Sequence, residues 1–439
     1  MRSILARVKT PTAGGEDVSN NQNESNGGCL LFFIDFIFNI IRNRKIRKYN
    51  KHARGLEQYQ KITTDALFPS DSYQENIIVS GGDVVERATF SERILRNAVI
   101  RNRAVIILHI SNWNLEKMIA SNGFGMISNK NSKTFDPFTS FELQEICQVV
   151  LDTCKEKYDI KPTGRYILQV VYDLLSAKKM RPYFANYADF TYHQMASRIN
   201  DSLTAGEITQ SQATDLNSLL MMGQSEISKI DTFFSDMKSQ IGHIAATNPA
   251  GVSAQSVLYA IKSGKTLCID LNSSANVMLI EMIVNSLTIA MSRGYEFSLY
   301  LDDVAIANNE MLKNVLCQKS NHNNIIFSKD LYALLNGKED LFSTIVGETE
   351  KTVLLSHGSH LSCEKWAKYI GEYEKIDVSH NTSGGFFAAG QWGYSSNLGQ
   401  TMTNKREYKV NPEEINRLPH GQVFVYDNRN GSLIQANVI

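Results

Sequence analysis

The sequence predicts an α/β protein whose sheet domain is interrupted by an all-α domain. Continuously apolar segments alternate with helical patterns in 76–110 and again in 265–357, which is typical of a parallel sheet. Between about 136 and 245, strand signals stop and apolar residues recur at helical spacing. A chain of 439 residues is long enough for two or three domains.

The N-terminal region divides into two parts. Residues 1–28 are polar and rich in Asn, Ser and Gly, which predicts a disordered tail. Residues 29–41, CLLFFIDFIFNII, contain Asp35 and are fewer than the roughly 20 apolar residues of a spanning helix. Basic residues follow this run up to residue 54, whereas a signal peptide carries them before it. The segment 29–54 therefore suits an anionic membrane surface, and a helix that packs on protein explains it equally well.

The first part of the sheet domain is expected at 55–135. Within it, NIIVS at 76–80 is a buried strand that meets two glycines, 90–102 is a helix with an apolar face, and 104–110 is the next strand. Strand, turn, helix and strand in this order predict a βαβ unit.

The all-α domain is expected at 136–245. Thr139 and Glu142 have the spacing of a capping box ahead of an apolar stripe, and Thr204 and Glu207 have the same spacing. Each pair is therefore expected to mark the start of a helix.

The sheet domain resumes at 246–439. A helix is expected at 276–292 and a hairpin at 422–438, with Asn430-Gly431 as its turn. Four further apolar segments are expected to be strands: 265–271, 297–303, 323–329 and 351–357.

A phosphate-binding loop is expected where the strand at 76–80 meets its helix. In the motif GxxxxGK[ST], backbone N–H groups hold phosphates, the lysine reaches the β and γ oxygens, and the hydroxyl binds Mg²⁺. Residues 80–89 read SGGDVVERAT. With Gly82 as the first glycine, Arg87 takes the second glycine position, Ala88 the lysine position and Thr89 the hydroxyl position. With Gly81 as the first glycine, the positions of the second glycine, the lysine and the hydroxyl are all filled by other residues. The position of the loop is therefore kept, and its chemistry is lost.

The strand at 297–303 ends in Asp302 and Asp303, where a phosphate-handling ATPase places an acid to hold Mg²⁺ or water. Asp303 is one methylene shorter than the Glu usual at the second position. A solvated turn at a strand end explains the pair as well, and both interpretations stay open.

Two other motifs contain residues that could form a site. His357, His360 and Cys363 have a metal-like spacing, but no fourth ligand is evident and a strand end followed by a helix explains them, so no metal site is predicted. The loop 383–397 combines glycines with four aromatic residues. It would suit stacking on single-stranded bases, although a subunit contact or a cap on the core is the favoured interpretation.

The order of these segments resembles the TraG/TraD coupling-protein family of type IV secretion and conjugation, within the FtsK–HerA superfamily of P-loop ATPases. The resemblance extends from about residue 70 to 430, and no single motif in it is diagnostic. Lys329 stands at the sensor position, where the family usually has Gln, and HISNWNLE replaces the family's D-x-K-G-E turn. The resembling segments are NIIVSGGDVVERATFSERIL, AIKSGKTLCIDLN, FSLYLDDVAI, NNIIFSKDLYALLNG and VNPEEINRLPHGQVFVY.

The resemblance implies a RecA-like P-loop NTPase domain in a hexameric ring. It implies ATP and Mg²⁺ as ligands, further copies or a related subunit as ring partners, and secretion-channel or relaxosome-like proteins and single-stranded DNA as other partners. A cytoplasmic location at the inner face of the cell membrane follows, with 29–54 as the surface contact. The implied nucleotide-binding residues are Gly81, Gly82, Arg87 and Thr89, the catalytic residues Asp302 and Asp303, and the sensor Lys329.

Three hypotheses for function follow. The chain is a coupling-protein-like pseudo-ATPase, a divergent but active DNA-stimulated motor, or a membrane-surface module whose ATPase fold is only structural. The first is favoured because the segment order is intact while the phosphate loop is broken. Composition agrees with an intracellular role: 45 basic and 45 acidic residues argue against a strongly basic nucleic-acid protein, and six cysteines without a CxxC pair favour a reduced compartment.

Overall fold

The computed structural model describes residues 27–246, 254–273, 275–318, 320–384 and 396–438. Residues 1–26 of the expected disordered tail and most of the aromatic loop at 383–397 lie outside these residues, whereas Gly27 and Gly28, expected in the tail, begin a helix. The chain divides into two compact units, one formed by 1–53 with 374–405 and the other by 54–373 with 406–439.

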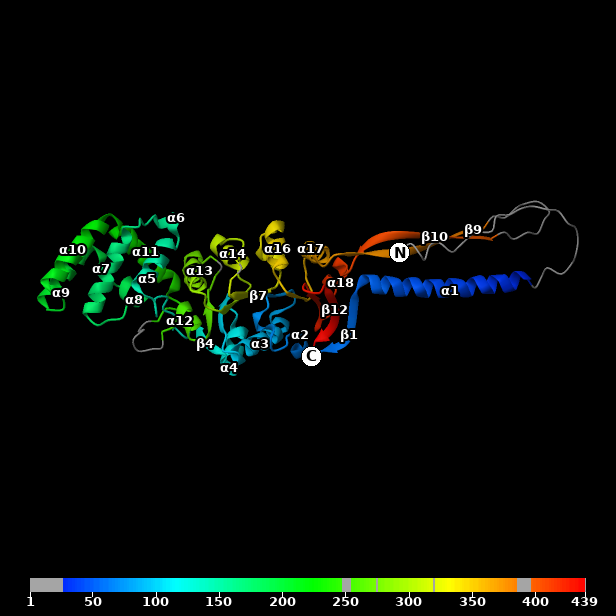
Figure 1. Cartoon of the computed structure of the whole chain (residues 1–439), viewed down its shortest axis with the longest axis horizontal. Coiled ribbons are helices and arrows are strands. Elements are labelled where there is room, and N and C mark those ends of the chain that lie inside the picture. The colour runs from blue at the N-terminus through cyan, green and yellow to red at the C-terminus, as the bar shows by residue number, and fades with distance from the viewer. Residues whose placement is uncertain (1–26, 247–253, 274, 319, 385–395, 439) are drawn as a thin grey trace, which may run out of the picture. The chain divides into compact units, whose positions relative to one another are not determined.

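The larger unit is built on a ten-stranded sheet (Figure 1). Its order is β1-β12-β11-β8-β2-β7-β6-β3-β5-β4. The strands are β1 Leu56–Ile62, β2 Ile77–Ser80, β3 Ala104–His109, β4 Gly125–Ser128, β5 Thr266–Asp270, β6 Phe297–Asp302, β7 His322–Ser328, β8 Lys351–Leu354, β11 Gln422–Asp427 and β12 Ser432–Val438.

The seven strands from β8 to β4 run parallel to one another. At the other side β11 pairs antiparallel with β8 and with β12, so the hairpin expected from the sequence is confirmed. β1 adds a parallel edge strand to β12. This mostly parallel sheet confirms the predicted α/β class.

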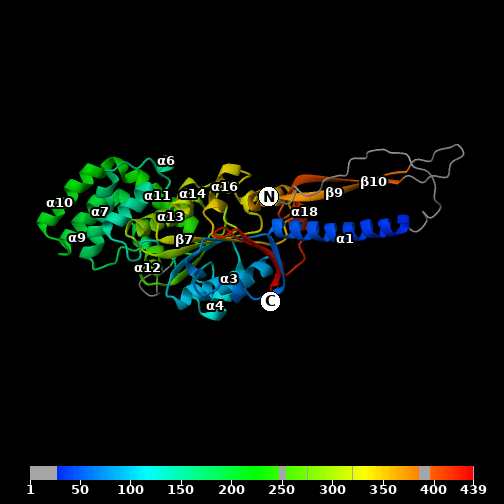
Figure 2. The same ribbon diagram turned by 45° about the vertical axis from the view of Figure 1, so that its right-hand side comes forward.

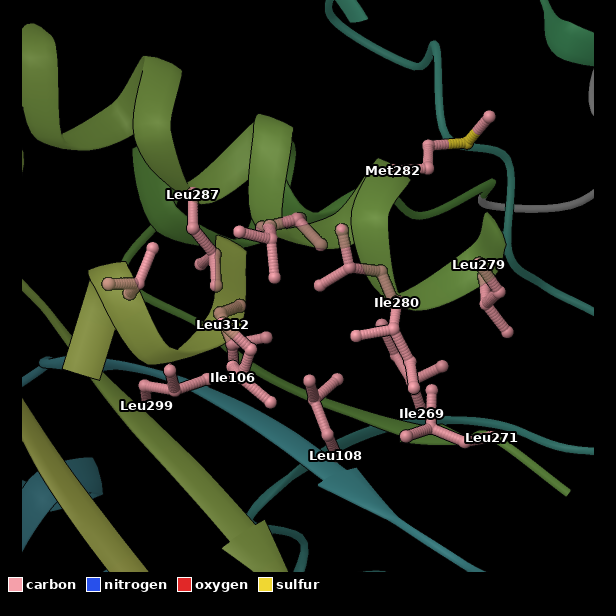
Figure 3. Packing of buried hydrophobic residues seen from close by; sticks show 14 of the residues in the cluster. Ile106, Leu108, Ile269, Leu271, Leu279, Ile280, Met282, Leu287, Leu299 and Leu312 are labelled. Atoms are coloured by element: carbon pink, nitrogen blue, oxygen red, sulfur yellow. The ribbon is translucent and has the colours of Figure 1, made fainter. Parts of the chain in front are cut away.

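Helices cover both faces of the parallel strands because the strands are apolar on both sides. Along β3, Val105 and Ile107 belong to the buried cluster that includes α3 (Val84–Ile100) and α4 (Trp113–Asn122). The alternate residues Ile106 and Leu108 belong to the buried cluster that includes α13 (Val277–Ser292), and Figure 3 shows them on the side of the sheet that this helix covers. Helices α12 (Val257–Lys262) and α14 (Glu310–Cys317) contribute to this same second face.

The region between β4 and β5 is helical and is seen as one group of helices in Figures 1 and 2. Its core is aromatic: Phe234 stacks against Tyr192 and Tyr187 and meets Phe138 edge to face. The boundaries of an all-α domain at 136 and 245 stay predictions. The helices are α5 Leu143–Asp152, α6 Lys155–Tyr158, α7 Gly164–Ala177, α8 Phe184–Ala188, α9 Met195–Thr204, α10 Gln210–Gly223 and α11 Ile227–Ile241.

Both capping boxes expected in this region were wrong in position. The cap of α5 is Glu142, which pairs with Glu145, because the helix begins one turn after Thr139. Thr204 is the last residue of α9, and the capping box that starts α10 joins Thr209 to Gln212. The spacing of a capping box recurs by chance, and only the local backbone decides which copy begins a helix.

The remaining helices of the larger unit are short or peripheral: α2 Thr64–Leu67, α15 Leu331–Leu334, α16 Glu339–Gly347, α17 His360–Ile370 and α18 Pro412–Asn416. The smaller unit contains all but the last residue of helix α1, Gly27–Arg54, and most of the two-stranded sheet of β9 (Glu372–Gly384) with β10 (Ser396–Tyr408). Within it, the Asn50 side chain donates to the Ile376 carbonyl and accepts from the Ile376 N–H, each at 2.9 Å.

Candidate functional site

The candidate site lies at the carboxyl edge of the parallel strands. His109, the last residue of β3, is opposite Asp302 on β6 and Asp270 on β5. Ser80 at the end of β2 is opposite Ser328 on β7. Ligands of open α/β sheets bind at this edge, so the polar strand ends stand where a nucleotide site would be.

The backbone N–H groups of the loop between β2 and α3 form hydrogen bonds with acceptors of the protein itself. Six of the seven N–H groups from Gly81 to Arg87 donate to protein acceptors. Gly81 and Gly82 donate to the carbonyls of Ser328 and Ser356 at 2.9 and 2.8 Å. These are the groups that hold phosphate in a working loop.

Two acidic side chains occupy the N-terminus of α3. Asp83 Oδ1 accepts from the N–H groups of Val85 and Glu86, each at 2.8 Å, and Glu86 Oε2 accepts from the N–H of Asp83 at 3.1 Å. The other Glu86 oxygen, Oε1, accepts from the N–H of Gly421 at 2.9 Å. A helix N-terminus attracts an anion, and here the protein supplies the anion itself.

Gly81 packs closely against His357 and Leu355. A Cβ on Gly81, whose φ is +96°, would lie 2.7 Å from His357 Nδ1 and from the Leu355 carbonyl. His357 is fixed in turn, because its Nδ1 lies 2.8 Å from the Leu355 carbonyl and its Nε2 lies 3.0 Å from Ser80 Oγ. Only glycine fits at position 81, and the loop is packed down on buried neighbours.

Arg87 joins the two halves of the expected site. Its guanidinium is buried, lies 2.7 Å from Asp303 Oδ2, and donates to the Gly82 carbonyl at 3.1 Å. Asp303 Oδ1 accepts from the Lys329 N–H at 2.7 Å, so the main chain of the sensor position reaches the site while the Lys329 side chain is exposed. The structure thus brings Gly82, Arg87, Asp303 and Lys329 together, whereas the Thr89 side chain is exposed on α3.

Asp302 has a separate, buried environment. Its Oδ2 accepts from the Asn112 side chain at 2.6 Å. Burial raises the pKa of Asp302 to about 6, and the negative charge of Asp303 acts in the same direction, while the Asn112 hydrogen bond opposes both. Burial also lowers the pKa of the neighbouring His109 to about 4, so its imidazole is neutral at pH 7.

The sequence analysis did not identify four polar residues of this edge as site residues: His109, Asn112, Glu116 and Asp270. His109 Nδ1 accepts from the Asn112 N–H at 3.1 Å, and its Nε2 lies 3.5 Å from Glu116 Oε1. Burial raises the pKa of Glu116. A signal was present, because His109 and Asp270 each end an apolar strand as Asp302 does.

His357, His360 and Cys363 do not converge on one point. His357 faces Ser80, the Cys363 thiol donates to the His357 carbonyl at 3.8 Å, and His360 Nε2 lies 3.4 Å from Glu364 on the surface of α17. These contacts are those of a strand end followed by a helix.

The residues at this edge do not fit the nucleotide that the architecture implies. The N–H groups that would hold phosphate already have acceptors, the carboxylates of Asp83 and Glu86 stand at the helix N-terminus, and Arg87 neutralises Asp303. A phosphate at this position would have to displace two carboxylates and would be repelled by them.

The sheet order and the helices on its two faces define a P-loop NTPase-type fold. The fold is similar to that of the bacterial conjugative coupling protein TrwBdeltaN70 in its unbound monoclinic form, with a TM-score of 0.54 at 14% identity over 87% of this chain and 88% of that one. The plasmid coupling protein TrwB in complex with the non-hydrolysable GTP analogue GDPNP gives a TM-score of 0.50 at 13% identity over 86% of this chain and 88% of that one. No family model matches the sequence, and no curated protein matches it. At these identities the likeness establishes the fold.

Proposed function

We propose that this protein is a coupling-protein-like component of a secretion, conjugation or DNA-translocation assembly and that it is a pseudo-ATPase. The fold similarity to TrwB supports the assembly class. The observation that carries the loss of catalysis is the loop itself, whose N–H groups donate to Asp83, Glu86 and backbone carbonyls. The fold would then provide surfaces for assembly and leave hydrolysis to another subunit.

The partners we propose follow from the same similarity. They are further copies or an active paralogue in a ring, secretion-channel or relaxosome-like proteins, and single-stranded DNA. A cytoplasmic location against an anionic membrane surface, contacted through 29–54, completes the proposal. Among the residues that the structure describes, no helix has the length and apolarity needed to cross a bilayer.

Calorimetry with Mg²⁺-ATP on the purified full chain tests the loss of catalysis. We expect no binding at millimolar nucleotide and no turnover with or without single-stranded DNA, because nucleotide would have to displace the internal acceptors of the loop. Asp303→Ala is the matched control for a contaminating ATPase, whose activity would be the same in both preparations.

The alternative function is an active, divergent motor in which Arg87 replaces the lysine and Asp302 and Asp303 hold Mg²⁺ and water. Arg87 already contacts Asp303 at 2.7 Å, which is the observation that favours it. Micromolar binding together with DNA-stimulated turnover that Asp303→Ala abolishes would establish this motor and refute the pseudo-ATPase.

A further inference from the structure

Three potential metal ligands from two distant segments meet beside the loop. His420, in the turn before β11, has its Nε2 at 3.6 Å from Glu86 Oε1 and at 3.8 Å from Asp83 Oδ2. One ligand atom from each of the three residues lies within 4.8 Å of the other two. Among the described residues, this is the one group of three His, Cys, Asp or Glu side chains with that geometry.

The two separations from His420 Nε2 are slightly longer than those of ligand atoms around one ion. They exceed the roughly 2.7–3.2 Å of an N–H···O hydrogen bond, so His420 is not hydrogen-bonded to either carboxylate. Ions such as Zn²⁺ take nitrogen and oxygen ligands at about 2.0–2.2 Å in a tetrahedron, which puts neighbouring ligand atoms about 3.4 Å apart. Small side-chain rotations would bring the three atoms to these positions.

The backbone already holds two of the ligands in place. Gly421 donates its N–H to Glu86 Oε1 at 2.9 Å, which keeps the turn that carries His420 against the start of α3. Asp83 uses Oδ1 for the helix cap and presents Oδ2 toward His420. The two carboxylates together balance the charge of a divalent cation, which outweighs the opposing positive potential of the helix N-terminus, about 0.3–1 kcal/mol.

We propose that Asp83, Glu86 and His420 bind a divalent transition-metal ion of the Zn²⁺ type, with water at the remaining position. The imidazole ligand favours Zn²⁺, Co²⁺ or Ni²⁺ over Mg²⁺ and Ca²⁺, which prefer all-oxygen sites. The ion would tie the loop before α3 to the turn before β11. This site goes beyond the proposed function and does not depend on it, because its ligands need no nucleotide.

Titration calorimetry of the metal-free full chain with Zn²⁺ tests the site. We expect one site of micromolar affinity in the wild-type protein. His420→Ala should weaken it by about tenfold or more, and Asp83→Asn should do the same while its amide oxygen still caps α3. His360→Ala is the matched control, since this exposed histidine lies 3.4 Å from a single carboxylate and should leave the affinity unchanged.

His420 is 73% exposed, so its replacement should leave the fold intact, and circular dichroism of each variant checks this. Zn²⁺ binding that persists in His420→Ala, an equal loss in His360→Ala, or no binding by the wild-type protein would overturn the proposal. Because the titration contains no nucleotide, its outcome is separate from that of the Mg²⁺-ATP experiment.

Discussion

At the residue scale, the contact between Arg87 and Asp303 is the feature with the sharpest energetic consequence. The Arg87 side chain is 4% exposed and that of Asp303 is 35% exposed, so removing the acid leaves a buried guanidinium without its charged partner. We expect Asp303→Ala to lower the free energy of unfolding by about 2–3 kcal/mol, discounted for the partial exposure of the pair. Urea unfolding followed by circular dichroism measures this.

Asp303→Asn is the matched variant. Asp303 has a φ of +52°, a conformation that Asn tolerates and Ala does not, and an amide oxygen can still accept from the Lys329 N–H. We expect Asp303→Asn to lower the free energy of unfolding clearly less than Asp303→Ala does. If both variants unfold like the wild-type protein, the ion pair contributes nothing to stability and Arg87 must be satisfied by the glycine carbonyls alone.

At the same scale, the sequence predicted which residues lie in one site, but it did not predict which side chains contact each other. Positions 82, 87 and 303 were expected in one site from the order of the segments, and they do meet. That Arg87 would turn toward Asp303, and that Glu86 would fold back on its own helix, depends on side-chain directions set by packing. His420 was beyond reach for a different reason, since only the tertiary fold brings it next to α3.

At the element scale, α3 depends on its cap. Asp83 and Glu86 form a capping box in which each side chain accepts from the other's backbone N–H. Asp83→Ala should lower the free energy of unfolding by about 1 kcal/mol, whereas Asp83→Asn should be nearly neutral, because Asn caps as well as Asp. Thermal unfolding of both variants checks this, and equal losses would show that the charge of Asp83 matters and the cap does not.

Elements with strong periodicity were predictable and those without it were not. The expected helix at 276–292 is α13, Val277–Ser292, because sixteen nearly continuous apolar and small residues between two strands leave little choice. β1 was missed, because five of its seven residues, from Glu57 to Lys61, are polar or exposed and only its neighbour in the sheet makes it a strand. Long-range pairing of this kind leaves no local signal.

The entry to the helical region contains a buried acid that should make stability depend on pH. Asp136 is 2% exposed and accepts from the N–H groups of Phe138 and Phe184 at 3.0 and 2.9 Å. Burial raises its pKa from 3.8 to about 7 against these hydrogen bonds. Between these two values the folded state holds a proton that the unfolded state releases, so the free energy of unfolding should fall as the pH rises, by at most about 1.4 kcal/mol per unit.

Urea unfolding at about pH 5 and about pH 7 measures this dependence. Asp136→Asn is the control, because it lacks the titrating group and the other titrating residues, His109 and Asp302 among them, contribute equally to both proteins. The free energy of unfolding of the wild-type protein minus that of Asp136→Asn should fall as the pH rises. A constant difference would mean that Asp136 is ionised throughout and that its hydrogen bonds outweigh its burial.

At the scale of the whole molecule, basic and acidic residues are equal in number but are unevenly distributed along the chain. The formal net charge is zero, yet the second half of α1 contains seven Lys and Arg residues between 42 and 54 and no acid. Arg42 donates to Asn39 Oδ1 at 2.8 Å, and Arg54 pairs with Glu414 at 2.5 Å and donates to the Lys409 carbonyl. Arg44, Lys45, Arg47, Lys48 and Lys51 are exposed, and so is Phe38 among the apolar residues that precede them.

This arrangement separates apolar and basic residues along α1 instead of around it, which suits a helix whose basic half meets anionic headgroups. We expect the full chain to sediment with vesicles that contain phosphatidylglycerol and to be released by salt, because each basic residue near such a surface contributes about 1 kcal/mol. Replacing the five exposed basic residues of α1 by Gln should abolish the binding. The control neutralises four lysines of the helical region, Lys155, Lys161, Lys178 and Lys179, and should bind like the wild-type protein. Equal binding by both variants would assign α1 to protein contacts, and the membrane surface would then leave the proposed set of partners.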